Sequence, residues 1–66
     1  MEIIVNGKSR QVPDDMGVPQ LLELLDLSGR RLALEINQEI VPRSHFATQR
    51  LCAGDRVEIV QAIGGG

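Results

Sequence analysis

A single stretch of helical periodicity, set among segments that alternate apolar and polar residues, restricts this chain to a few folds. Four apolar residues of that stretch recur at i, i+3, i+4 and i+7 and share one helix face: Val18, Leu21, Leu22 and Leu25. We predict that Gly17 is the N-cap and that Ser28-Gly29 ends the helix. A helix with one apolar face must cover a second layer, and the remaining patterns predict that this layer is a β-sheet.

The N-terminal segment predicts a β-hairpin. Alternation of apolar and polar residues begins at Met1 and continues to Val5, and Asn6-Gly7 follows at once. This dipeptide favours a type I′ turn, in which both central residues have positive φ. We expect the return strand from about Ser9 to Val12, ended by Pro13, which cannot donate to a strand ladder.

The second half of the chain predicts three further strands. Residues Leu32 to Asn37 alternate, and a tight turn at Asn37–Glu39 leads into a short strand at Ile40-Val41. The last strand, Arg56 to Ile63, is rich in β-branched residues.

The order hairpin, helix, strand, short strand, last strand predicts an α+β fold of two layers. We expect the β-grasp, or ubiquitin-like, arrangement: a mixed sheet of about four to five strands, with one main helix packed on one face. The first and last strands are the most apolar and should form the central pair. Residues 1–63 would form this domain, and residues 64–66 a flexible C-terminal glycine tail.

Composition excludes several classes of function. Cys52 and His45 are the single cysteine and the single histidine, too few for a disulfide or a zinc site. The net charge of -2 and the single aromatic residue, Phe46, argue against a nucleic-acid partner. Neither a secretory signal pattern nor an apolar run of about 20 residues is present. We therefore expect a cytoplasmic protein with no metal and no membrane partner.

The chain ends on Gly64, Gly65 and Gly66. Without Cβ atoms such a tail can enter a channel that side chains would block. The reactive group at its tip is the carboxylate of Gly66, which becomes an acylating agent only after activation, usually by ATP. The alternative interpretation is a frayed end or a leftover of cloning.

Residues just before the glycines are candidates for docking a partner enzyme. Val57 and Ile59 share one face of the last strand, and Val60 lies on the other. Packing in the core and docking on the surface both remain open for Val60. Ala62 and Ile63 are the other two docking candidates, and apolar residues on an outer face indicate an interaction surface.

Three stretches carry a resemblance to a known family. They are "VPQLLELLDL" (Val18 to Leu27), "LALEINQEIVPR" (Leu32 to Arg43) and "GDRVEIVQAIGGG" (Gly54 to Gly66). With these stretches the chain resembles, over its whole length, the ThiS family of sulfur carrier proteins in thiamine biosynthesis. The family's minimal terminal motif is Gly-Gly, so the third glycine is a departure that leaves Gly65 as an alternative working terminus.

The resemblance implies a protein co-substrate rather than an enzyme. A ThiF-type, E1-like enzyme would use ATP and Mg²⁺ to adenylate Gly66, and sulfur from a cysteine desulfurase would convert the terminus to a thiocarboxylate. Thiazole synthase (ThiG) would take up that sulfur. The free carrier is expected to be a monomer with no stably bound cofactor.

Other functions share this fold. The small subunit of molybdopterin synthase has the same tail chemistry with a different acceptor, although the stretch "NQEIVPR" and the short chain favour the thiamine family. A β-grasp binding module, such as an RNA-binding domain, would make the tail incidental. A ubiquitin-like conjugating role would pass the activated glycine to an amine.

Overall fold

The Asn6-Gly7 turn joins the first two strands in the computed structural model, which describes residues 1–61. Strand β1 (Glu2–Val5) pairs antiparallel with β2 (Lys8–Gln11). Asn6 and Gly7 have φ values of 48° and 81°, which confirms a turn with two positive φ angles. The return strand stops at Gln11, and Val12 leaves the strand and is buried in the core.

Helix α1 (Val18–Leu24) begins after Gly17 as predicted, but it ends earlier than expected. Ser28-Gly29 was the wrong end, because Asp26 adopts the left-handed conformation with φ 60° that a glycine usually supplies. The backbone N–H of Leu27 then donates to the carbonyl of Leu22 at 2.7 Å, which closes the last turn. The pattern is a Schellman motif with an aspartate at the left-handed position.

Strands β3 (Leu32–Ile36) and β4 (Glu39–Ile40) form the second hairpin. Its turn has positive φ at both Asn37 (53°) and Gln38 (70°) and contains no glycine. Strand β4 lies one residue before the expected Ile40-Val41, because the Val41 side chain turns into the core.

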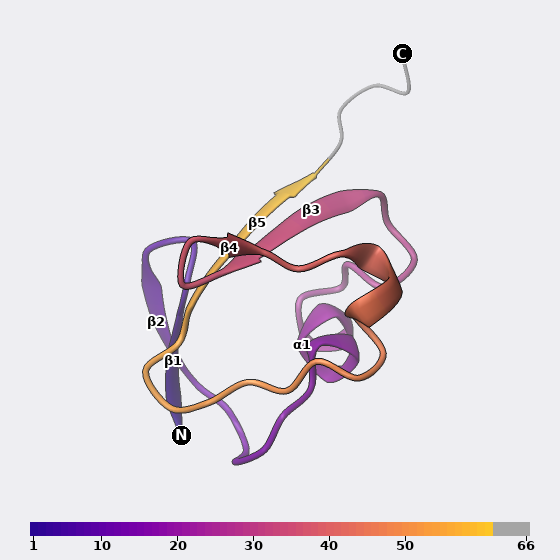
Figure 1. Ribbon diagram of the computed structural model, residues 1–66. Coiled ribbons are helices and arrows are strands. Elements are labelled where there is room, and N and C mark those ends of the chain that lie inside the picture. Colours follow the sequence, from indigo (N-terminus) through magenta and orange to yellow (C-terminus); the bar gives the residue numbers. More distant parts are fainter. Residues whose placement is uncertain (62–66) are drawn as a thin grey trace.

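Strand β5 (Arg56–Gln61) occupies the centre of the sheet, whose order is β2-β1-β5-β3-β4. It runs parallel to β1 and antiparallel to β3, so the sheet is mixed and the predicted central pair is confirmed (Figure 1). A 3-10 turn, η1 (Arg43–His45), lies in the connection that leads to β5. This arrangement is the β-grasp fold expected from the sequence.

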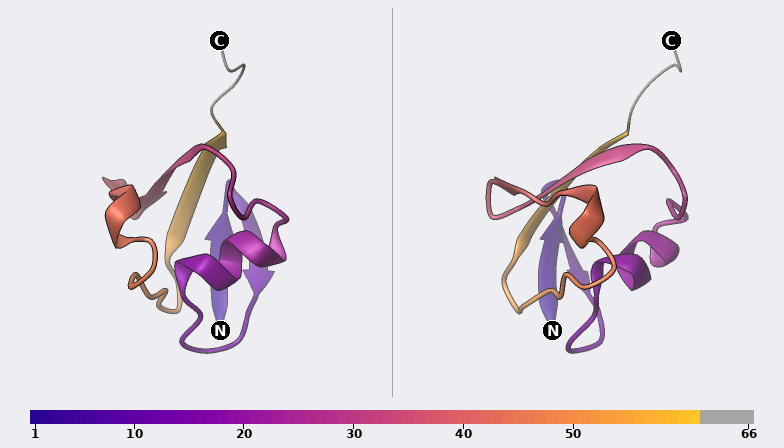
Figure 2. Two further views of the ribbon diagram at one scale, coloured as in Figure 1. Left: turned by 90° about the vertical axis from the view of Figure 1, so that its right-hand side faces the viewer. Right: turned by 45° about the vertical axis from the view of Figure 1, so that its right-hand side comes forward.

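The core lies between α1 and one face of the sheet (Figure 2). Its buried residues come from the inner face of the strands, the helix stripe and the connecting segments: Ile3, Val5, Val12, Val18, Leu21, Leu22, Leu34, Ile36, Val41, Leu51, Val57 and Ile59. Leu25, the fourth residue of the predicted stripe, is partly buried against this cluster. Leu24 is 52% exposed, as its place off the stripe predicts.

Both hairpin turns hold β5 through an asparagine side chain. The amide of Asn6 accepts the Ile59 N–H at 2.8 Å and donates to the Ile59 carbonyl at 3.3 Å. Asn37 accepts the Arg56 N–H at 3.0 Å and donates to the Asp55 carboxylate at 3.0 Å. The strand that precedes the glycines is therefore fixed by side chains as well as by its two neighbouring strands.

Candidate functional site

The central strand β5 ends in the described structure at Gln61. Five predicted site residues follow it in sequence and lie outside the described residues: Ala62, Ile63, Gly64, Gly65 and Gly66. The expected boundary between domain and tail, at residue 63, lies there as well. Five residues span at most about 17 Å.

Val60 lies on the outer face of the sheet, directly opposite Ala33 on β3. Its side chain is 66% exposed, whereas its neighbour Ile59 is buried on the face that α1 covers. Of the two interpretations left open by the sequence, packing in the core is wrong for Val60. Its exposure beside the start of the tail leaves the docking role as a prediction.

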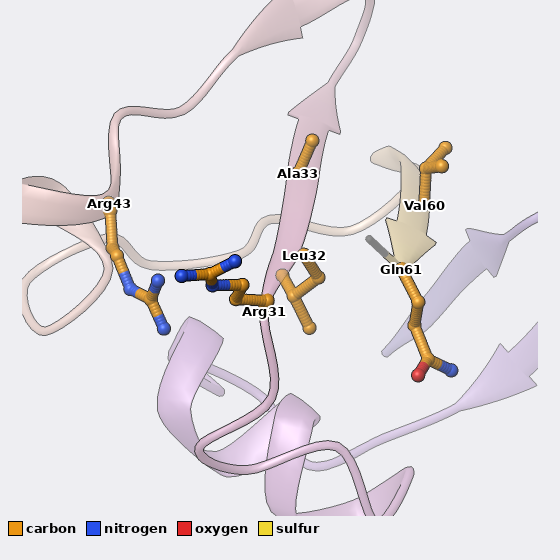
Figure 3. A pocket seen from close by; sticks show the side chains of 6 residues that line it. All are labelled: Arg31, Leu32, Ala33, Arg43, Val60 and Gln61. Carbon is orange, nitrogen blue, oxygen red and sulfur yellow. The ribbon is translucent and has the colours of Figure 1, made fainter. Parts of the chain in front are cut away.

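A shallow hollow of about 380 Å³ adjoins Val60 at the C-terminal end of β5. Val60, Ala33 and Leu32 give it an apolar wall, and Gln61 lines it too. In Figure 3 the guanidinium groups of Arg31 and Arg43 extend toward one another at its other side. Apolar surface and positive charge therefore meet beside the residue from which the tail continues.

No pattern in the sequence predicted that Arg31 and Arg43 would line the same hollow. Arg43 ends the family-like stretch "LALEINQEIVPR", and Arg31 immediately precedes that stretch. The two are twelve residues apart by their numbers, and the β3–β4 hairpin brings them to one hollow. No periodicity connects an arginine before a strand with one that opens a 3-10 turn.

The rest of the outer sheet face carries carboxylates between apolar side chains. Glu35 on β3 lies directly opposite Glu58 on β5, a like-charge pairing that weakens a sheet. Ile40 on the edge strand lies opposite Glu35 and is 73% exposed. Helix α1 packs on the other face, so none of the described residues, 1–61, forms a layer over this mixed surface (Figure 2).

The cysteine and the histidine weighed in the sequence are both exposed. Cys52 is exposed, and its backbone N–H donates to the Asp55 carboxylate at 2.8 Å within the turn before β5. His45 is exposed on η1. Within residues 1–61, no three His, Cys, Asp or Glu side chains are grouped so as to hold a metal ion. The helix described in this range is too short to cross a membrane.

A β-grasp domain whose central strand leads to a terminal run of glycines defines the class of ubiquitin-like carrier proteins. The family model that matches the chain is that of the ThiS family, over residues 3–66. The sulfur carrier protein ThiS of Escherichia coli is 39% identical over 66 residues, which cover all of both chains. The chain belongs to the ThiS family.

Further relatives agree with this assignment. ThiS of Bacillus subtilis is 35% identical over 63 residues, covering 94% of this chain and 96% of that protein. The crystal structure of the thiamine biosynthesis protein ThiS from Geobacter metallireducens superposes with a TM-score of 0.85 at 32% identity, covering all of both chains. A thiazole synthase of Paramagnetospirillum magneticum is 42% identical over 66 residues, and the chain spans only 20% of its length.

These similarities establish the general function. The protein is a sulfur carrier of thiamine biosynthesis, which confirms the resemblance drawn from the sequence. It acts as a protein co-substrate and not as a catalyst.

Proposed function

We propose that the carboxylate of Gly66 is the group that carries sulfur. A ThiF-type enzyme transfers the adenylyl group of ATP, with Mg²⁺, to this carboxylate and releases pyrophosphate. A persulfide supplied through a cysteine desulfurase then displaces AMP to form an acyl disulfide, and a thiol reductant cleaves its S–S bond to leave a C-terminal thiocarboxylate. Thiazole synthase takes the sulfur, and the carrier returns with its carboxylate for another cycle.

The observation that carries this proposal is the family match, which extends through residue 66 and so includes all three glycines. Glycine is the residue type that such chemistry needs, because a tail without Cβ atoms fits a narrow active-site channel. Strand β5 provides a fixed base for this tail, since it is bonded to β1, β3 and the side chains of Asn6 and Asn37.

The similarity to a thiazole synthase supports that enzyme as the acceptor. The matched region lies in the same polypeptide as the rest of that synthase and includes the full length of this chain. A carrier joined to its acceptor delivers sulfur at high effective concentration. The separate chain described here would reach the same kind of enzyme by docking.

Docking would use the apolar surface beside the tail. Val60 and Ala33 are exposed opposite one another on β5 and β3, and Ala62 and Ile63 follow in sequence. An enzyme that receives the tail must approach this end of the sheet. Burying these side chains in the complex would contribute roughly 25 cal/mol per Å² of apolar surface, before the costs of association.

Intact-mass measurement tests the proposal directly. The full chain is incubated with its adenylating enzyme, ATP, Mg²⁺ and a sulfur source. The expected result is a mass gain equal to the exchange of one oxygen for one sulfur, absent when ATP is omitted. A chain without Gly66 should give no gain, and a chain modified equally well without it would move the working carboxylate to Gly65.

Two further experiments test the docking surface and the acceptor enzyme. Val60→Glu should slow the modification without lowering thermal stability, because the side chain is exposed. The thiocarboxylate form is then given to thiazole synthase and, separately, to molybdopterin synthase lacking its small subunit. We expect product with thiazole synthase and none with molybdopterin synthase. The proposed function is refuted if the chain stays unmodified with an enzyme that activates a known carrier.

A further inference from the structure

We propose that Arg31 and Arg43 together form a recognition site for carboxylate side chains on the adenylating enzyme. The site is the hollow beside Val60 and Gln61, which we call the arginine hollow. The inference rests on the proposed function, since it concerns the enzyme that would activate the tail. It adds a charged contact, with its residues and the chemistry of its partner, to the apolar docking surface.

The backbone positions the two arginines on one hollow. Arg31 immediately precedes β3, and Arg43 opens η1 after the β3–β4 hairpin. The Arg43 guanidinium donates from Nη2 to the Arg30 carbonyl at 3.4 Å, which draws η1 toward the segment before β3. The two guanidinium groups extend toward one another in Figure 3, and both arginines line the hollow, so an anionic group that enters it meets positive charge from two segments of the chain.

No carboxylate of the described residues neutralises this pair. The ion pairs within residues 1–61 join the N-terminal amino group to Asp14 and Arg50 to Asp15. Neither Arg31 nor Arg43 has a carboxylate of that range within ion-pair distance, although acidic residues outnumber basic ones in the sequence, 9 to 7. Two facing cations repel each other, and an anion between them removes that cost.

The chemistry of arginine specifies the partner. A guanidinium presents a planar set of donors that matches a carboxylate in two parallel hydrogen bonds. The adjoining wall of Leu32, Ala33 and Val60 is apolar, which suits a protein surface better than a free small anion. The occupant that fits is therefore a segment with Asp or Glu side chains beside apolar ones.

The position of the arginine hollow selects the adenylating enzyme. Gln61 lines the hollow and is followed directly by the tail, so an enzyme that receives Gly66 covers this surface. In the proposed cycle the adenylating enzyme is the first to receive the tail, because thiazole synthase takes sulfur only from a chain that is already activated and thiocarboxylated. A separate activating enzyme must be met by diffusion, where complementary charges raise the association rate.

Charge reversal tests the site. Association of the full chain with its adenylating enzyme is measured by surface plasmon resonance at low and at physiological ionic strength. Arg31→Glu and Arg43→Glu should each slow association by about tenfold at low ionic strength, with a smaller loss at the higher one. Arg10→Glu is the matched control, because it makes the same charge change on β2, at the opposite edge of the sheet. It should stay within about twofold of wild type.

Folding and activity measurements separate the outcomes. The double variant Arg31→Gln, Arg43→Gln removes both charges with less disturbance, and circular dichroism verifies that each variant is folded. If Arg31→Glu and Arg43→Glu both associate with the enzyme as fast as Arg10→Glu does, the inference is wrong. Association with thiazole synthase is measured in the same way. If the charge reversals slow that association alone, the choice of the adenylating enzyme as the partner is wrong. Failure of the wild-type chain to become thiocarboxylated at saturating enzyme would instead refute the proposed function itself.

Discussion

Replacement of Asn6 by glycine should destabilise the fold although it leaves the turn geometry intact. Glycine accepts the φ of 48° found at this position, so the change removes only the side-chain amide. That amide continues the parallel β1–β5 ladder beyond its last backbone bond, from the Asn6 N–H to the Val57 carbonyl at 2.9 Å. Without it, the N–H and C=O of Ile59 lose their partner on the β1 side.

The magnitude follows from those two hydrogen bonds. Each contributes about 1 kcal/mol net, and the backbone entropy cost of glycine, up to about 1 kcal/mol, is offset because glycine has no Cβ to disfavour the positive φ. We expect a loss of about 2 kcal/mol, from a total of roughly 3 to 10 kcal/mol for a domain of this size. The melting temperature should fall by about 8 to 16 °C.

Urea unfolding followed by circular dichroism measures the loss, and amide hydrogen exchange at Ile59 locates it. Gln38→Gly is the matched control: it also places glycine at a positive φ in a hairpin turn, but the Gln38 side chain makes no hydrogen bond within residues 1–61. It should leave stability unchanged or raise it. A loss below about 0.5 kcal/mol for Asn6→Gly, with Ile59 still protected, would refute the role assigned to the amide.

Two further predictions concern the helix. Leu21→Ala, at a fully buried position, should cost about 2 to 5 kcal/mol in urea unfolding, whereas Leu24→Ala on the exposed side should change stability by less than about 1 kcal/mol; equal effects would contradict the assigned core. Asp26→Gly should raise the free energy of unfolding by up to about 1 kcal/mol, because glycine adopts φ 60° without a Cβ penalty. A lower melting temperature for this variant would show that the aspartate side chain stabilises the end of the helix.

Local patterns predicted most of the elements of the fold. Asn6-Gly7 fixed the first hairpin, and the helix stripe identified Val18, Leu21 and Leu22 as core residues. The end of the helix was missed because Asp26, an ordinary residue in a helical pattern, takes the left-handed position before the first glycine is reached. Propensity alone does not reveal which polar residue will accept that conformation.

Contacts between distant segments were the part that the sequence did not reveal. The bonds from Asn6 to Ile59 and from Asn37 to Arg56 depend on strand register, which is settled only when the sheet assembles. The exposure of Val60 follows from strand alternation once the buried face is known. The meeting of Arg31 and Arg43 has no such local rule, because it depends on where the β3–β4 hairpin places η1.

The parallel pairing of β1 and β5 determines how the domain bears mechanical load. Because the two strands run in the same direction, the start of β1 and the end of β5 lie at opposite ends of the pair (Figure 1). Tension between these two points pulls the strands past one another, so the bonds from Ile4 to Asp55, from Asn6 to Val57 and from the Asn6 amide to Ile59 are loaded together in shear. They must break nearly at once rather than one after another. Force applied between the start of β1 and the tail that follows β5 therefore acts in the direction in which these bonds resist together.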